Sequence, residues 1–153
     1  MSDHPDSSST KTCRDYTAAF LLLRLFLGLR TLAAGLEKFE ANKSYSFSNY
    51  SENMTRMATG ISNYSVIPLW AANAFAQSLG FLLVGFGAAI LLGIKTRCAL
   101  FLTGLIYVGL GFGLMAVQEG DGVAWIGMHV LMFAVALVLV RHNRFALVAD
   151  KAD

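Results

Sequence analysis

Apolar residues gather into four long runs along the chain, and short polar segments separate them. The runs cover residues 17–36, 68–92, 98–117 and 122–140. Each run is close to the about 20 helical residues that cross a hydrocarbon core of about 30 Å. Because residues 94–97 and 118–122 are the only links between the last three runs, consecutive helices must be antiparallel neighbours. The pattern predicts an all-α fold, an antiparallel four-helix transmembrane bundle.

A shorter periodic segment lies in the link between the first two runs. Its apolar residues recur at helical spacing: Tyr50, Met54, Met57 and Ile61. Asn49 can cap this segment with Glu52 three residues later, and Gly60 offers a stop. We expect a short amphipathic helix on the outer membrane face. The alternative is a polar loop.

Composition supports a membrane protein. The 153 residues are 56% hydrophobic and 14% charged, with a mean hydropathy of +0.55, whereas a soluble domain carries about 25% charged residues. We expect residues 17–148 to form one domain. Residues 1–16 are expected to be a polar, disordered cytoplasmic tail, and residues 149–153 a second cytoplasmic tail.

The basic residues in the short flanks predict the orientation of the spans. One side holds Lys11, Arg14, Lys95, Arg97, Arg141, Arg144 and Lys151, and the other holds Lys38, Lys43 and Arg56. Both termini are therefore expected in the cytoplasm. We expect lipid and other membrane subunits as partners, and no nucleic acid.

Two arginines stand well inside the first run. With the span centred near residue 27, Arg24 and Arg30 would each lie about 4–5 Å from the midplane. A charge there costs about 2.5–3.5 kcal/mol on insertion scales. In one interpretation, Arg30 reaches Glu37 and Arg24 extends to lipid phosphates. In the other, both bind an anion from outside the chain: a lipid headgroup, a quinone, a sulfur oxyanion or a partner's carboxylate.

Small residues share the helix face of Arg24. Gly28, Thr31 and Gly35 lie on this stripe, with Lys38 beyond them. Such a stripe lets another helix approach closely. It is consistent with docking of a partner helix and, equally, with a ligand.

The fourth run carries an intramembrane histidine. Asp121, Trp125 and His129 fall on one face at i, i+4 and i+8. His129 is our one candidate for a catalytic residue, through a hydrogen bond to a quinone or proton transfer. The alternatives are a satisfied core histidine and a ligand role within a complex.

Several further polar residues are expected near the outer half of the bundle. Asn73 and Gln77 lie one turn apart on the second run. Together with Glu37, Lys38, Asp121 and His129 they would line a cavity between helices, and Trp125 suits the aromatic belt at the outer interface. The alternative is ordinary hydrogen bonding between helices. A quinone is the one cofactor these residues suggest, and neither haem nor metal is expected within the chain.

Three segments carry a resemblance to a known family. LLRLFLGLRTLAAGLEKF (residues 22–39), GFGAAILLGIKTR (85–97) and RHNRFAL (141–147) resemble, in order, the first span, the end of the second span and the tail of the DoxX/DoxD-like family. The resemblance covers about residues 20–148. It implies a small four-helix protein of the bacterial inner membrane, related to the small subunit of thiosulfate:quinone oxidoreductase and to MauE-like maturation factors. Many relatives carry a glutamate where this chain has Leu83, which puts chemistry based on that acid in doubt.

Three functions remain open at this point. The first is a mainly structural subunit of a larger membrane redox complex, without catalysis of its own. The second is a quinone-linked oxidoreductase subunit. The third is a maturation factor for exported redox proteins, against which the absence of a C-x-x-C pair counts.

Overall fold

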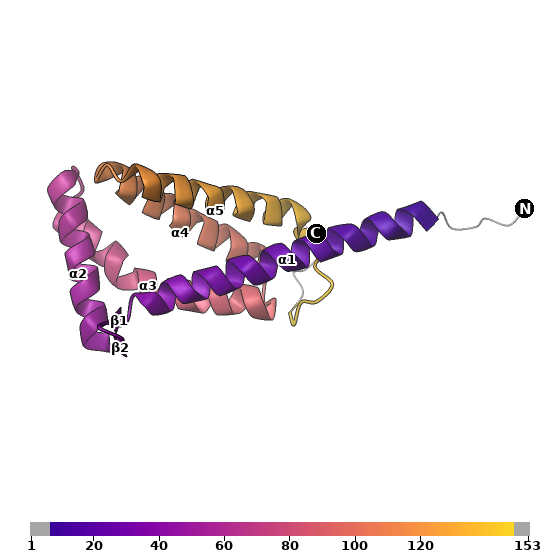
Figure 1. Ribbon diagram of the computed structural model, residues 1–153, viewed down its shortest axis with the longest axis horizontal. Coiled ribbons are helices and arrows are strands. Elements are labelled where there is room, and N and C mark those ends of the chain that lie inside the picture. The colour runs from indigo at the N-terminus through magenta and orange to yellow at the C-terminus, as the bar shows by residue number, and fades with distance from the viewer. Residues whose placement is uncertain (1–6, 149–153) are drawn as a thin grey trace, which may run out of the picture.

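The computed structural model describes residues 7–148, and of residues 7–13 only the backbone. It confirms the all-α fold, with four helices long and apolar enough to cross a membrane. Figure 1 shows the elements in order: α1 Ser7–Glu37, β1 Glu40–Ala41, β2 Ser44–Tyr45, α2 Phe47–Tyr64, α3 Leu69–Leu92, α4 Thr96–Ala116, α5 Gly120–Leu139 and the 3-10 helix η1 Val140–His142. The expected tail 149–153 and residues 1–6 lie outside the described range.

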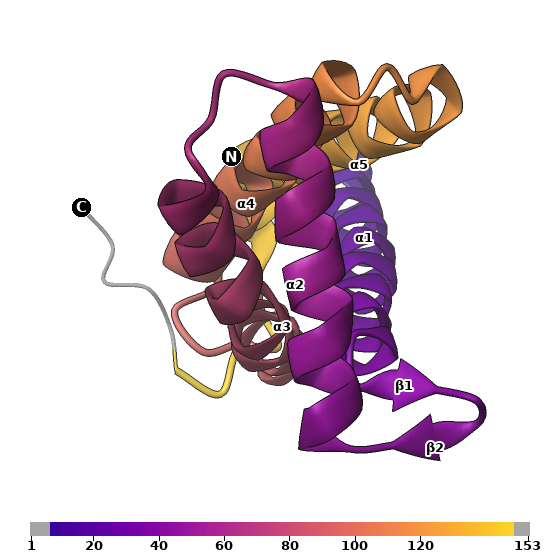
Figure 2. The ribbon, with the colours of Figure 1, turned by 90° about the vertical axis from the view of Figure 1, so that its left-hand side faces the viewer.

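The helices pack in pairs. α1 lies along α3, α4 lies along α5, and α2 crosses α3 at one end of the bundle (Figure 2). We call this the hairpin end (residues 37–68 and 117–119). The opposite tail end holds the α3–α4 link, η1 and the segment after it (residues 93–95 and 140–148).

The first helix is longer than expected. α1 begins at Ser7, so residues 7–16, which we expected to be disordered, continue the helix. No glycine or proline interrupts the chain between Ser7 and Leu27. Extending an existing helix gains one hydrogen bond for each residue fixed, so helix formation spreads from the apolar run. In Figure 1 this part of α1 runs beyond the tail end of the bundle.

The amphipathic helix is present with different ends. Ser46, in an extended conformation, caps α2, and its Oγ accepts a hydrogen bond from the Asn49 N–H at 3.1 Å. Asn49 is therefore inside the helix. Gly60 is also inside, because apolar contacts of Ala58 and Ile61 continue past it and α2 ends only at Tyr64. α2 buries Tyr50, Met54 and Ala58.

A β-hairpin that we did not anticipate connects α1 to α2. β1 and β2 pair antiparallel, and the two turn residues Asn42 and Lys43 have φ of 51° and 61°. Two consecutive positive φ angles are typical of a type I′ turn, which asparagine tolerates better than most residues. Asn53 of α2 holds the hairpin by donating from Nδ2 to the main-chain oxygens of Lys38 and Glu40 (3.2 and 3.0 Å).

The stripe of small residues on α1, which we predicted to dock a partner helix, contacts other helices of the same chain. A Cβ added to Gly35 would lie 2.8 Å from the main-chain N of Val84, and one added to Gly28 would lie 2.7 Å from the Leu91 side chain. Both glycines therefore face α3, and Thr31 faces α4. A stripe of small residues predicts close helix contact, and here the contacting helix belongs to the same chain.

Tyr50 anchors α2 to α3. Its hydroxyl donates to the main-chain oxygen of Gln77 at 2.7 Å and accepts from the N–H of Gly80 at 3.2 Å. Burial raises the pKa of the Tyr50 phenol above its usual 10.0, partly offset by the backbone N–H groups of Gly80 and Phe81.

We expect Tyr50→Phe to lower the free energy of unfolding by about 1–2 kcal/mol, because Gln77 and Gly80 lose a buried partner. Tyrosine is charged only after losing its proton, so a raised pKa in the folded state means that the unfolded state deprotonates first. Wild-type stability should therefore fall as pH rises above about 10, and Tyr50→Phe should show a shallower fall. Thermal unfolding of both proteins from pH 8 to 11 measures this. A parallel fall in both would contradict the role of the phenol.

Candidate functional site

Arg24 is the centre of a hydrogen-bond network at the tail end. Its Nη1 donates to Asn143 Oδ1 at 2.8 Å and to the main-chain oxygen of Phe145 at 2.9 Å. Its Nη2 lies 3.4 Å from the main-chain oxygen of Leu91. Asn143 in turn donates from Nδ2 to Thr96 Oγ1 at 2.9 Å. The network joins α1 to the end of α3, the start of α4 and the segment after η1.

The guanidinium of Arg24 lies nearer to the tail end of the bundle than we expected. A Cβ added to Gly93 would lie 3.0 Å from Arg24 Nη1, so the guanidinium is level with the α3–α4 link rather than with the middle of the bundle. Arg24 is only 6% exposed. Its partners come from the chain itself, so the argument that an anion from elsewhere must compensate this charge no longer holds. The alternative, extension toward lipid phosphates, is not needed either.

For Arg30 the structure agrees with the first of the two interpretations, in which this side chain reaches Glu37. Its Nη1 lies 3.7 Å from Glu37 Oε1, and the two side chains are 43% and 60% exposed. An exposed ion pair of this kind contributes about 0–1 kcal/mol. Arg30 is therefore a weakly held cation near the hairpin end.

His129 is buried in the interior of α5, with 8% of the residue exposed. Its Nδ1 lies 2.7 Å from the main-chain oxygen of Trp125. Because a carbonyl only accepts, this contact assigns the proton of the neutral ring to Nδ1 and leaves a lone pair on Nε2. That Nε2 atom is buried and has no hydrogen-bond partner among residues 14–148.

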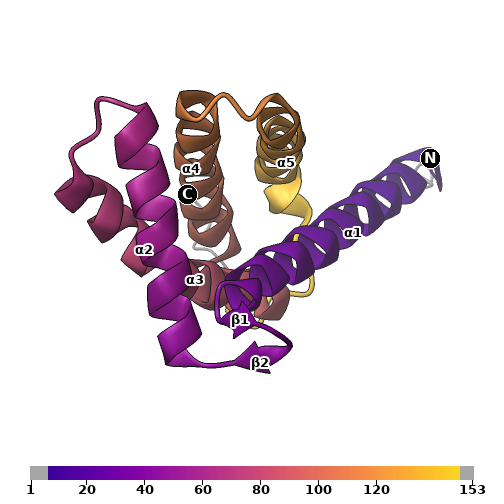
Figure 3. The same ribbon diagram turned by 60° about the vertical axis from the view of Figure 1, so that its left-hand side comes forward.

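Two further polar side chains from other helices connect to His129: Tyr107 lies against its ring, and Thr31 lies beside Tyr107. The Tyr107 ring of α4 stacks on the imidazole, with centroids 5.4 Å apart. The hydroxyl groups of Tyr107 and Thr31 face each other without a well-formed hydrogen bond, and Arg30 and Glu37 are within electrostatic reach of Tyr107. We call His129, Tyr107 and Thr31 the His129 cluster; it joins α5, α4 and α1, which Figure 3 shows from the hairpin end.

Tyr107 was not among the candidate site residues predicted from the sequence. One signal was available: a phenol hydroxyl in the middle of an apolar span needs a polar partner, as an intramembrane histidine does. The two residues lie on different helices, however, and spacing within one span does not predict a contact between spans. Thr31 was assigned to helix docking for the same reason.

The residues expected to line one outer cavity do not gather in one. Glu37 and Lys38 line a shallow cavity of about 360 Å³ whose other walls are α2 residues. Asn73 and Gln77 are half-buried on α3, where the main-chain oxygen of Gln77 bonds Tyr50. The Trp125 side chain is 70% exposed, although its carbonyl meets His129. Of these residues, only Glu37 both lines the shallow cavity and lies within electrostatic reach of Tyr107 in the His129 cluster.

Within the described part of the chain, no three His, Cys, Asp or Glu side chains come together as a metal site would require. Leu83 is fully buried in the main apolar core. A carboxylate at this position would be surrounded by apolar side chains. This chain has leucine there and therefore no carboxylate at position 83.

Four apolar helices around a small polar cluster define a polytopic membrane protein of the helix-bundle class. The chain belongs to the DoxX family, whose sequence model matches residues 19–116. The match includes α3 and α4 and most of α1, whereas α5 and the segment after it lie beyond the matched range. No curated protein and no solved structure matches the chain.

Proposed function

We propose that the protein is a small membrane subunit of a redox complex and that it binds a quinone ring at the His129 cluster. The observation that supports this most is the buried, unpartnered Nε2 of His129. An unsatisfied polar atom in an apolar interior costs about 1–3 kcal/mol. Such a cost is understandable where a ligand from the bilayer supplies the missing hydrogen bond.

The chemistry of a quinone matches the groups of the cluster. A hydroquinone O–H donates to the lone pair of Nε2, and a quinone carbonyl accepts from a protonated Nε2 or from the hydroxyl groups of Tyr107 or Thr31. The ring of Phe26 also stacks with the imidazole, with centroids 6.4 Å apart, and is half exposed at the surface of the bundle. Movement of this side chain would open the cluster to lipid. The electrons for quinone reduction would come from a partner subunit of the complex.

Two expectations from the sequence remain part of the proposal: a partner subunit in the membrane, and an orientation with both termini in the cytoplasm. The part of α1 that extends beyond the tail end, residues 7–16, offers a surface to a partner subunit (Figure 1). Basic residues at the tail end, Lys95, Arg97, Arg141 and Arg144, support placing both termini in the cytoplasm of a bacterial cell. Retention of a partner in mild detergent, lost when residues 7–16 are deleted, would support the subunit assignment.

Quinone binding is tested by titrating a short-chain quinone into the protein in lipid nanodiscs, with heat as the readout. We expect His129→Leu to weaken binding by about tenfold or more, because the ligand oxygen loses its buried partner. Thr31→Val, which keeps the shape and removes the hydroxyl, should weaken it less.

Met128→Leu is the matched control, because this neighbouring side chain is exposed on the outside of α5. Thermal unfolding establishes that each variant is folded. Equal Kd values for the wild type, His129→Leu and Met128→Leu would refute binding at the cluster, and so would a wild type that binds no quinone.

A further inference from the structure

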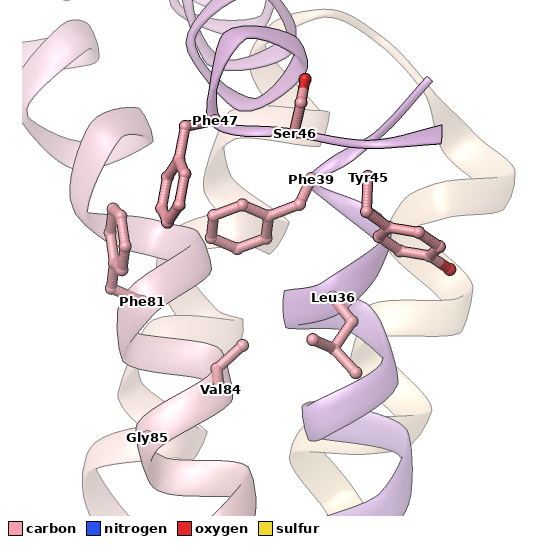
Figure 4. Close-up of a pocket in the computed structure, with 8 residues that line it drawn as sticks. All are labelled: Leu36, Phe39, Tyr45, Ser46, Phe47, Phe81, Val84 and Gly85. Atoms are coloured by element: carbon pink, nitrogen blue, oxygen red, sulfur yellow. The ribbon is translucent and has the colours of Figure 1, made fainter. Parts of the chain in front are cut away.

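An apolar cavity lies beside the β-hairpin, apart from the His129 cluster. Its volume is about 610 Å³, and Figure 4 shows the residues that line it: Leu36, Phe39, Tyr45, Ser46, Phe47, Phe81, Val84 and Gly85. Leu36 is in the last turn of α1, whereas Val84 and Gly85 lie well inside α3. The cavity therefore extends from the hairpin into the level of the membrane-spanning helices.

Aromatic packing holds the walls of this cavity apart. The Phe39 ring stacks on Tyr50 with centroids 4.4 Å apart, and it meets Phe47 and Phe81 edge to face at 5.8 and 5.5 Å. Tyr50 is itself fixed to α3 by the bonds to Gln77 and Gly80. The three phenylalanines of the wall are thus held by contacts with other rings, so they are not free to fill the cavity.

The cavity offers almost nothing to water. Ser46 Oγ is already used to cap α2, and Tyr45, the other polar residue, is mostly exposed. An ordered water needs two to four polar partners. The neighbouring side chains Leu36 and Phe81 are exposed on the surface of membrane-spanning helices, so the cavity is continuous with the surface that hydrocarbon covers.

We propose that one acyl chain of a membrane phospholipid occupies this cavity. A helix about 10 Å in diameter fills about 420 Å³ per turn, so the cavity would hold less than two turns of a partner helix. A flexible chain fits a narrow apolar space without this limit. The tyrosine at the hairpin suits the boundary between the chain and its polar headgroup, where aromatic hydroxyl groups are favoured.

Gly85 allows a direct test, because nothing lies within 4 Å of a Cβ added there. Gly85→Leu adds a branched side chain at a residue that lines the cavity, and its Cβ has open space around it. Gly127→Leu is the matched control: it is also helical and open, but it lies on α5, away from the cavity. Neither residue belongs to the His129 cluster.

Native mass spectrometry of the detergent-purified protein measures the bound lipid, and chromatography of the extract identifies it. We expect the wild type and Gly127→Leu to retain one phospholipid, and Gly85→Leu to show occupancy lower on the order of tenfold, since the new side chain displaces about two or three methylenes. Equal occupancy in Gly85→Leu, no retained lipid in the wild type, or retention of a quinone in place of a phospholipid would overturn the proposal.

A second measurement covers the case in which Gly85→Leu does not fold. Phe81→Trp puts a fluorescent reporter at the cavity wall. In bilayers of phospholipid brominated on its acyl chains, the added emission should be quenched more strongly than the emission of the wild-type tryptophans. Quenching no stronger than that of the exposed Trp125 would contradict an acyl chain beside residue 81.

Discussion

Replacing Arg24 with leucine should lower the free energy of unfolding by about 3 kcal/mol, the largest loss that we expect from any single charged residue of this chain. Hydrogen bonds from a charged donor contribute about 1.5–3 kcal/mol each, and the change removes those to Asn143 and to the main-chain oxygens of Phe145 and Leu91. Removing a buried cation recovers part of this loss, because its desolvation cost disappears. Circular dichroism during heating should show a Tm lower by roughly 10 °C.

Arg30→Leu is the matched control, because it removes the same charge from the same helix. Its only ion pair among the residues that the structure describes is the exposed contact with Glu37, so the expected change is within about 1 kcal/mol. Asn143→Ala completes a double-mutant cycle with Arg24→Leu. The two losses should be less than additive, since both substitutions break the same bond. Similar losses for Arg24→Leu and Arg30→Leu would show that the tail-end network does not determine stability.

A single added methyl group at Gly87 should also destabilise the fold, by about 1–3 kcal/mol. The new Cβ would lie 2.6 Å from the main-chain N of Leu32 and 2.8 Å from its Cα. These are backbone atoms of α1, so no side-chain rotation relieves the contact and the two helices must move apart. Close approach of helices through small residues is a main source of packing energy inside a membrane.

Gly85→Ala, two residues earlier on the same helix, distinguishes this contact from the general effect of replacing glycine. Its Cβ meets nothing within 4 Å, so it should be neutral or raise stability by up to about 1 kcal/mol through better helix propensity. Thermal unfolding of both variants under identical conditions measures the difference. If Gly87→Ala were as stable as Gly85→Ala, α1 and α3 would not be in direct backbone contact.

Much of the architecture could be predicted from local pattern. The lengths of the apolar runs and the short links predicted four spans in antiparallel order, and the structure contains four helices in those places. The period of Tyr50, Met54 and Ile61 predicted α2, and the spacing of Arg30 and Glu37 predicted their contact. These features depend on residues close together in the chain, whose relative positions follow from helix geometry alone.

The candidate site could not be predicted in the same way. Arg24 was correctly singled out as a charge that needs partners, yet those partners are 67 to 121 residues away. His129 was identified as a polar residue in an apolar span, but its neighbours Tyr107 and Thr31 come from two other helices. Neither the periodicity of one helix nor its composition specifies which face meets which neighbour.

The sequence by itself determined that this protein is a bundle of four membrane-spanning helices with an amphipathic helix across one end. It did so because hydrocarbon requires each span to satisfy its own backbone hydrogen bonds, which a helix does. The length and hydropathy of each apolar run therefore suffice to identify a spanning helix. Only the tertiary structure decided that the glycines of α1 contact α3, that Arg24 is bound by the chain's own carbonyl groups and that His129 keeps an unpartnered nitrogen. Those outcomes depend on how the helices rotate and cross, which side-chain packing between distant segments sets.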